Sequence, residues 1–392
     1  MFKILTFNNI AVEGLRRLPR ERYEAASEIA HPDAIILRSF DLHGMDIPNT
    51  VVAIGRAGAG TNNIPVEAMS ERGVPVFNAP GANANAVKEL VIAGLLLGAR
   101  NICGANEYVR GLTETGDALN DAVETAKKKY LGFELPGKML GVVGLGATGV
   151  EVANAALEMG MKVVGFDPKI TVRRAWQLSA GVVQADTLDQ LFRNADAVTL
   201  HVPLLNGTRD LVNRDRLKLM NDGALLVNFA RGGVANNKAV LAALDSGKLH
   251  AYVCDFPTPE LIAHPKVIAL PHLGASTTEA EENCAIMVAE NIKDYLENGN
   301  IRYSVNFPEC RLPRMDAHRI TIANANVPNM VGQISTCLAE SGLNIEDLLN
   351  KSVGELAYTI IDVNEPVSQA SEAQIRAIDG VLTLRNLGKP VT

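Results

Sequence analysis

A glycine-rich turn with an acidic residue downstream has the clearest chemical meaning in this chain. The turn is Gly144-Leu145-Gly146-Ala147-Thr148-Gly149, and Asp167 follows eighteen residues after its last glycine. The first glycine allows a tight turn, the second lets the backbone approach a pyrophosphate, and the third lets a helix pack closely on a strand. This spacing predicts a dinucleotide site, in which a nicotinamide would exchange a hydride with the substrate.

The segments around the turn have the patterns that such a site needs. A helix is expected from about Ala147 to Met159, and the apolar run Met161–Phe166 predicts a strand that ends at Asp167. The helix N-terminus would face the phosphates, and the Asp167 carboxylate would accept ribose hydroxyls and repel a 2′-phosphate. These features favour NAD as the cofactor. NADP stays open as an alternative because of three nearby cations, Lys169, Arg173 and Arg174.

Composition limits the function classes. The chain has 392 residues, 47% of them hydrophobic, and a formal net charge of −7, which argues against a nucleic-acid partner. Its five cysteines are scattered without disulfide or metal-ligand spacing, so we expect no metal and a reducing compartment. The N-terminus has no basic leader and no apolar run is long enough to span a membrane, so a cytoplasmic location without membrane contact is expected.

The alternation of strands and helices predicts an α/β chain with two doubly wound parallel-sheet domains. Residues 1–99 and 280–303 are expected to form a discontinuous first domain, and 100–279 the dinucleotide-binding Rossmann domain. Residues 304–316 contain prolines and are expected to be a linker, and 317–392 show a split βαβ pattern.

Individual elements follow from apolar runs. The expected strands of the two larger domains are Lys3–Phe7, Ala34–Leu37, Val51–Ile54, Val74–Phe77, Ala197–Val202, Ala224–Asn228, His250–Cys254 and Val267–Ala269. Two helices are expected at Val87–Ala99 and Thr277–Asn298, the second starting with a Ser276…Glu279 capping box. The elements of the last domain are expected at Arg319–Ala323, Met330–Ser341, Glu355–Val363, Glu372–Ile378 and Val381–Leu384.

Three segments follow strands of the expected Rossmann domain: Val227–Gly233, Val253–Glu260 and Leu270–Thr277. Open α/β sheets bind ligands at the carboxyl ends of their strands, so polar residues in these segments are candidates for the site. From about residue 50 to 300, the motifs and their order resemble those of the D-isomer-specific 2-hydroxyacid dehydrogenases. The family implies a bound NAD and oxidation of a hydroxyl group next to a carboxylate.

The resemblance assigns catalytic roles to three residues. The family's arginine falls on Arg231, its glutamate on Glu260 twenty-nine residues later, and its histidine on His272. Their chemistry suits these roles, since a histidine exchanges protons near neutral pH, a carboxylate orients its ring and a guanidinium binds a carboxylate. We expect His272 to be the acid/base, Glu260 its orienting partner and Arg231 the substrate clamp. Leu261 follows Glu260 where the family usually has proline, and the loop to His272 is short, so Glu260 is the weakest of the three assignments.

The resemblance also implies cofactor contacts. The turn residues Gly144 to Gly149 would face the pyrophosphate, and Asp255 would face the nicotinamide carboxamide. His201 is expected to lie beside the cofactor or to pack, and not to act as a second base. Further expected cofactor contacts are Pro203, Thr208, Ala230 and Gly274.

Two N-terminal segments, Ile54–Asn63 and Asn78–Asn83, are similar to those of the branch of the family that oxidises 3-phospho-D-glycerate. Here Gly81, Ala82 and Asn83 would offer amides to the substrate carboxylate. Arg56 would bind the 3-phosphate, with Arg38 as a second candidate, because a doubly charged group needs cations. Lys127 belongs to a lysine triplet. The triplet would either reach the site of a neighbouring subunit or simply lie on a solvent-exposed face.

The C-terminal residues resemble an ACT domain, a ferredoxin-like amino-acid-sensing module. The matching effector residues are Asn324, Asn326 and Asn344, which would bind L-serine between two such domains. Asn329 stands where the family usually has glycine, and asparagine tolerates the left-handed backbone. The alternative is a module that only joins subunits. In either case a homo-oligomer, dimer or tetramer, is expected.

Together these features predict NAD-dependent oxidation of 3-phospho-D-glycerate to 3-phosphohydroxypyruvate, the first step of L-serine biosynthesis. Two alternatives stay open from the sequence. One is a glyoxylate or hydroxypyruvate reductase of the same family. The other is a non-catalytic protein that binds NAD as a sensor on the same fold.

Overall fold

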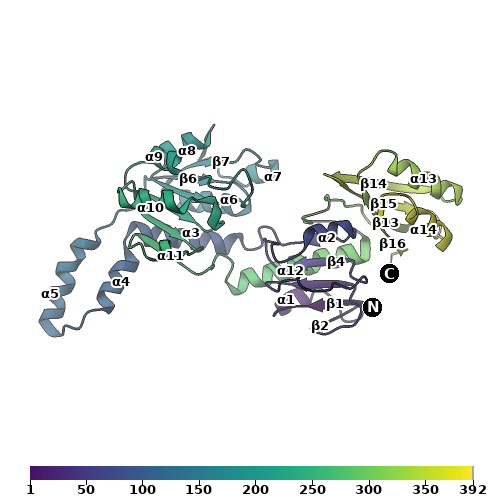
Figure 1. The fold of residues 1–392 in the computed structure, drawn as a ribbon, viewed down its shortest axis with the longest axis horizontal. Coiled ribbons are helices and arrows are strands. Elements are labelled where there is room, and N and C mark those ends of the chain that lie inside the picture. The colour runs from purple at the N-terminus through teal and green to yellow at the C-terminus, as the bar shows by residue number, and fades with distance from the viewer. Residues whose placement is uncertain (391–392) are drawn as a thin grey trace. The chain divides into compact units, whose positions relative to one another are not determined.

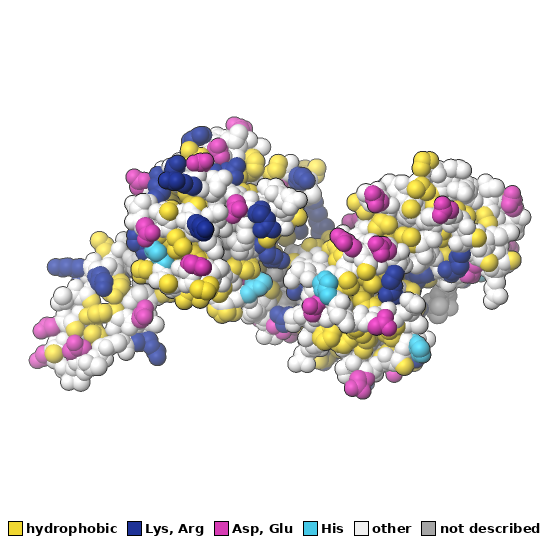
Figure 2. All heavy atoms as spheres, in the orientation of Figure 1, with side chains coloured by type: hydrophobic (Ala, Val, Ile, Leu, Met, Phe, Trp, Pro, Cys, Tyr) yellow, Lys and Arg dark blue, Asp and Glu magenta, His cyan; other side chains and the backbone are white. Residues whose placement is uncertain are grey.

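The computed structural model describes residues 1–390, and the chain divides into two compact units (Figure 1). The first unit contains Met1–Ala82 and the chain from Glu281 onward, and the second contains Asn83–Ala280. On the face shown in Figure 2, cationic and acidic side chains are interspersed. Among the described residues, no helix is both long and apolar enough to cross a membrane.

The first unit contains a parallel sheet of five strands in the order β2-β1-β3-β4-β5. The strands are β1 Phe2–Thr6, β2 Tyr23–Ala26, β3 Ala34–Leu37, β4 Ala53–Arg56 and β5 Val76–Phe77, with short helices α1 Val12–Leu15 and α2 Val66–Glu71. Strand β2 was not expected from the sequence, because this short edge strand has two exposed residues and no apolar run.

Helix α12, Thr278–Asn298, packs from Glu281 onward on this sheet. Its side chains Val288 and Ile292 are fully buried. A Cβ atom on Gly55 of β4 would lie 2.4 Å from Val288 Cγ1, so the close approach requires glycine there. The helix is capped by Thr277, whose Oγ1 accepts from Ala280 N at 3.1 Å. The expected capping box at Ser276 is therefore wrong by one residue.

The second unit contains a parallel sheet of seven strands in the order β12-β11-β10-β9-β6-β7-β8. Its strands are β6 Met139–Val143, β7 Lys162–Phe166, β8 Val182–Gln184, β9 Ala197–Leu200, β10 Ala224–Asn228, β11 Leu249–Cys254 and β12 Val267–Ala269. Its helices after β6 are α6 Ala147–Glu158, α7 Val172–Ala175, α8 Leu188–Asn194, α9 Arg214–Leu219, α10 Asn237–Asp245 and α11 Pro259–Ile262. The two parallel sheets confirm the predicted α/β class.

Helix α3, Ala84–Ala99, belongs to the second unit, whereas the sequence places a boundary after it. Cβ atoms on Gly94 and Gly98 would lie 3.1 Å from side-chain atoms of Phe229 and Leu225, so these glycines let α3 pack tightly on the sheet. Helices α4 Ile102–Arg110 and α5 Gly116–Ala126 have no buried residue. They project from the body of this unit as a two-helix arm (Figure 1).

The C-terminal part of the first unit has the order β13, α13, β14, β15, α14, β16, with the antiparallel sheet β14-β15-β13-β16. This is the expected ferredoxin-like arrangement. The bounds are β13 His318–Ala325, α13 Met330–Glu340, β14 Ile345–Val353, β15 Leu356–Val363, α14 Gln369–Arg376 and β16 Val381–Gly388. Strand β14 was missed because most of its residues are polar and none is fully buried. Asn329 has φ +64°, the left-handed backbone expected of it.

The segment expected to be a linker is packed against the rest of the first unit. Ile301 and Cys310 form an antiparallel bridge, and Phe307, Cys310 and Leu312 are buried. The prolines that suggested a linker therefore lie in an ordered connection between α12 and β13.

One buried arginine holds that connection together. Arg319 of β13 forms a bidentate ion pair with Asp362 of β15, both bonds 2.7 Å long, and both side chains are almost completely buried. Its Nη atoms also donate to three backbone carbonyls at 2.8–3.1 Å: Asn298, Leu312 and Pro313. All five guanidinium N–H groups are thereby used, and they join the end of α12 to the C-terminal sheet.

We expect Asp362→Asn to lower the free energy of unfolding by about 3–5 kcal/mol, because it leaves a buried guanidinium without its counter-charge. Chemical denaturation of the full chain measures this. Asp316→Asn, which breaks the exposed pair with Lys389, is the control and should cost no more than about 1 kcal/mol. Equal effects of the two substitutions would contradict the central role of the buried pair.

Candidate active site and cofactor site

The glycine turn has the geometry that the sequence predicts. Gly144 has φ +92°, and a Cβ atom there would lie 2.6 Å from the His201 carbonyl oxygen. A Cβ atom on Gly149 would lie 1.9 Å from the Gly144 carbonyl oxygen, so α6 can begin this close to β6 only with glycine. Gly146 has no atom within 4 Å of its would-be Cβ. The turn is closed on its inner side and open at Gly146.

Asp167 is fixed against this turn at the end of β7. Its Oδ2 accepts from Leu145 N and its Oδ1 accepts from Lys169 N, both at 2.8 Å. The Leu145 amide is thereby used within the protein and its side chain is buried, so Leu145 shapes the turn. Ala147 and Thr148 begin α6, which has no side-chain cap, and their amides are the donors at this helix N-terminus.

The loop after β9 is closed by its own hydrogen bonds. Thr208 Oγ1 donates to the Pro203 carbonyl oxygen at 2.5 Å and accepts from Leu205 N at 2.8 Å. His201 Nε2 lies 3.0 Å from Thr199 Oγ1, and burial lowers the pKa of His201 to about 3. The ring is therefore neutral at physiological pH and only a weak base, and its place beside the cofactor stays a prediction.

Asn228, at the end of β10, positions Ala230 and Arg231. Its fully buried side chain accepts from Ala230 N at 3.1 Å and donates to the Arg231 carbonyl oxygen at 3.0 Å. Arg231 Nη1 donates to the Ala230 carbonyl oxygen at 2.7 Å. No role for Asn228 was predicted from the sequence, although an amide side chain at the end of an apolar strand was a signal that could have indicated one.

Asp255 lies at the end of β11 and is 1% exposed. Its Oδ2 accepts from Gly274 N at 3.3 Å, while its Oδ1 is buried without a partner among the described residues. Burial raises the pKa of the Asp255 carboxyl, although nearby His272 acts in the opposite direction. A buried carboxylate oxygen that lacks a donor is suited to accept one from a ligand.

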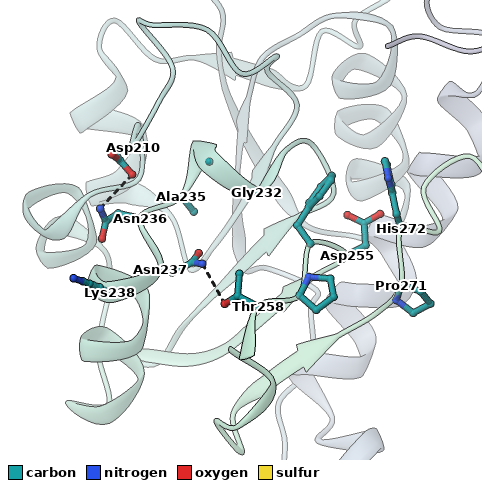
Figure 3. Close-up of a pocket in the computed structure, with 13 residues that line it drawn as sticks. Asp210, Gly232, Ala235, Asn236, Asn237, Lys238, Asp255, Thr258, Pro271 and His272 are labelled. Atoms are coloured by element: carbon teal, nitrogen blue, oxygen red, sulfur yellow. Dashed lines mark hydrogen bonds between the residues drawn. The ribbon is translucent and has the colours of Figure 1, made fainter. Parts of the chain in front are cut away.

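His272 stands beside this carboxylate. Figure 3 shows the His272 ring next to the Asp255 side chain, and the ring packs on Phe256 with centroids 4.9 Å apart. The two residues line a cavity of about 820 Å³. Its other lining residues include Gly232, Gly233, Pro257 and Thr258. The structure thus brings an acid/base side chain, a buried carboxylate and the turn after Arg231 to one end of the sheet.

Glu260 does not join this group. Hydrogen bonds from its own backbone N–H and from the Thr258 hydroxyl hold the pKa of Glu260 below its usual range. Between residues 1 and 390, no hydrogen bond links Glu260 to His272. The cause is α11, which buries Leu261 in the core and leaves Glu260 exposed in its first turn. The carboxylate beside His272 is Asp255, and the predicted Glu260–His272 pair is not formed here.

The candidate substrate residues belong to both units. In the first unit, Arg38 forms an ion pair with Glu281. The Arg56 side chain lies against Gly58, where a Cβ atom would be only 1.7 Å from Arg56 Nη1. Gly81 has φ +82°, and Ala82 ends this segment of the unit. In the second unit, Asn83 precedes α3 and Lys127 pairs with Glu124.

The three candidate effector residues lie in or near the C-terminal sheet. Asn324 is buried, its Nδ2 donates to the Ala325 carbonyl oxygen at 2.7 Å, and its Oδ1 has no partner among residues 1–390. Asn326 Nδ2 donates to the Gly354 carbonyl oxygen at 3.0 Å, and Asn344 has an exposed side chain. No hydrogen bond within the described chain connects the three asparagines.

Comparison with known proteins identifies the family. Residues 93–274 match the D-isomer specific 2-hydroxyacid dehydrogenase, NAD binding domain. Over 352 residues the chain is 33% identical to the D-3-phosphoglycerate dehydrogenase of Escherichia coli (strain K12), covering 86% of this chain and 82% of that protein. The chain belongs to the D-isomer-specific 2-hydroxyacid dehydrogenase family. The predicted resemblance and the NAD-binding domain are thereby confirmed.

Other similar proteins differ more from this chain in length. The D-3-phosphoglycerate dehydrogenase of Methanocaldococcus jannaschii is 35% identical over 353 residues, and the alignment spans 87% of this chain but only 63% of that relative. The crystal structure of the TT0316 protein from Thermus thermophilus has a TM-score of 0.61 and 29% identity, covering 78% of this chain and 100% of that one.

Two glycine substitutions should separate folding from cofactor binding in this chain. Gly149→Ala should cost about 1–3 kcal/mol of stability, because the new methyl group meets the Gly144 carbonyl. Gly146→Ala should change stability by less than about 0.5 kcal/mol but weaken NADH binding, since its methyl group would occupy the open face of the turn. Thermal unfolding and NADH fluorescence titration measure both. NADH binding by Gly146→Ala at the wild-type affinity would contradict this placement of the pyrophosphate.

Asp255→Asn should make the ligand-free protein more stable near neutral pH while lowering its activity. The raised pKa means that the folded state disfavours the carboxylate, so Asp255 destabilises the fold above the ordinary carboxyl pKa. The gain should shrink as pH falls, because both proteins are then uncharged at this position. Thermal unfolding from pH 3 to 8, with exposed Asp222→Asn as the control, tests this. A wild type as stable as the variant at pH 7 would contradict the argument that burial of the charged Asp255 carboxylate destabilises the fold.

Proposed function

We propose that this protein catalyses NAD-dependent oxidation of 3-phospho-D-glycerate to 3-phosphohydroxypyruvate, the first step of L-serine biosynthesis. The observation that carries the proposal is the buried Asp255 carboxylate beside His272 at the strand ends of an NAD-binding domain. Relatives named D-3-phosphoglycerate dehydrogenase at 33–35% identity support the choice of substrate.

The donors of this chain fit the proposed cofactor. The Gly144–Gly149 turn and the free amides of α6 would hold the pyrophosphate, and Asp167 keeps lone pairs for the ribose hydroxyls. Asp255 Oδ1 would accept from the carboxamide N–H₂ and so satisfy its missing donor. His201, Pro203, Thr208, Ala230 and Gly274 shape the walls around it. When bound, NAD supplies the acceptor for the hydride that leaves C2.

His272 would take the hydroxyl proton of the substrate as the hydride departs and the C2 carbonyl forms. The Asp255 carboxylate stabilises the positive charge that then develops on the imidazole ring. Arg231 would bind the substrate carboxylate through its guanidinium fork. Glu260 would have to give up its hydrogen bonds to its own backbone N–H and to the Thr258 hydroxyl to orient His272, so we assign the larger electrostatic role to Asp255.

Arg56 is proposed to bind the substrate phosphate. Arg38, which is ion-paired with Glu281, is the second candidate. The amides of Gly81, Ala82 and Asn83 would bind the substrate carboxylate. Lys127 would contribute to the site of a neighbouring subunit. Exposed apolar side chains on the α4–α5 arm, Ile102, Val109 and Val123, support a homo-oligomer.

The C-terminal part of the first unit, from β13 to β16, is proposed to be an ACT domain that binds L-serine. The unpartnered Oδ1 of buried Asn324 and the left-handed turn at Asn329 support this role. The cysteines, all of them free, are in keeping with the reducing conditions of the cytoplasm, where we place the enzyme.

The deciding measurement is NADH formation with 3-phosphoglycerate and with D-glycerate. Arg56→Met should lower kcat/KM for the phosphorylated substrate about 10- to 100-fold and leave D-glycerate turnover unchanged, because only the phosphate loses a charged partner. His272→Gln should lower kcat about 10²- to 10⁴-fold for both substrates.

Two results would overturn the assignment. Turnover of glyoxylate or hydroxypyruvate with NADH, but none of 3-phosphoglycerate, would indicate a reductase of the same family. NAD binding without turnover of any of these acids would indicate a sensor.

A further inference from the structure

A second cavity of about 600 Å³ lies in the first unit, along one face of α12. Its lining combines that helix with the connection that follows it, and Gly81 and Ala82 also contribute. Its polar lining side chains are Asn283, Glu290, Asn291, Asp294, Arg302 and Arg311. None of these side chains has a role in the proposed reaction.

Asn291 has an unmet hydrogen-bonding requirement in this cavity. The residue is 6% exposed, and its buried Nδ2 has no acceptor within residues 1–390. Buried amide groups in proteins almost always have a hydrogen-bond partner. A ligand in the cavity with an acceptor oxygen would supply the one that is missing.

Two guanidinium groups add positive charge to the same lining. Arg302 stacks on the Tyr303 ring at 4.6 Å and donates to the Tyr303 hydroxyl at 3.0 Å, which fixes its position. Among the described residues, neither Arg302 nor Arg311 forms an ion pair. Both remain available for a carboxylate, which a guanidinium binds through parallel hydrogen bonds.

Two carboxylates balance this charge. Asp294 Oδ1 accepts from the amides of Asn298 and Asn300 at 2.8 and 3.0 Å, and Glu290 lies 3.6 Å from Arg17. The formal charges of the four charged lining side chains therefore sum to zero. A phosphate dianion would meet two like charges here, whereas a zwitterion would satisfy groups of both signs. The apolar Ile286 and Met287 complete the lining and suit a small side chain.

We propose that this cavity binds a small zwitterionic α-amino acid. Its carboxylate would accept from Asn291 Nδ2 and the guanidinium groups, and its ammonium group would donate to Asp294 and Glu290. Because Gly81 and Ala82 also line the cavity, occupancy would alter the loop to which we assign the substrate carboxylate. Only this last effect rests on the proposed function, and the binding itself does not.

The test is isothermal titration of the full-length protein with L-serine, glycine and L-alanine, and with inorganic phosphate as the anion probe. In an Asn344→Ala background, which removes the serine site proposed above, Arg311→Ala, an exposed position, and the near-isosteric Asn291→Asp should each weaken the remaining amino-acid binding about tenfold or more. Arg193→Ala, an exposed arginine on α8, is the matched control and should bind as wild type does.

Three results would overturn the proposal. The first is loss of all amino-acid binding in Asn344→Ala alone, which would place the ligand in the C-terminal part of the first unit. The second is binding of phosphate, and of no amino acid, that Arg311→Ala abolishes. The third is no binding of any probe. Absence of 3-phosphoglycerate turnover would refute the proposed function but would leave this titration unaffected.

Discussion

The parallel arrangement of the seven-stranded sheet is the constraint on which the candidate site depends. Because every strand runs in the same direction, β6, β7, β9, β10 and β11 all end at one edge. Gly144, Asp167, His201, Asn228 and Asp255 are distant in sequence, yet each stands at or directly after one of these ends. The chemistry of the site follows from that shared edge, and the helices between the strands mainly fix its spacing.

Residues whose roles depend on local backbone geometry could be predicted from the sequence. The glycines of the turn, the strand-ending Asp167 and the left-handed Asn329 all lie where their types and spacing indicated. The apolar strands of both parallel sheets were also found, because burial on both faces produces continuous hydrophobic runs. Strands β2, β8 and β14 were missed because they are partly exposed and have no long apolar run.

Residues whose roles depend on side-chain direction could not be predicted in this way. Glu260 has the expected spacing from Arg231, but burial of Leu261 turns Glu260 toward its own helix end. Asn228 and Arg319 act through hydrogen bonds to backbone groups that only the folded chain brings near. The prolines of the predicted linker likewise gave no sign that Phe307 and Cys310 would be buried.

The packing of α12 on the first sheet has a consequence for synthesis of the chain. The core of that sheet includes Ala285, Val288 and Ile292, so it cannot be completed when Ala82 leaves the ribosome. About 200 further residues must follow, which at about 5–20 residues per second corresponds to roughly 10–40 s. The second unit can fold during that interval, while the exposed sheet face of the first is open to aggregation or chaperone binding.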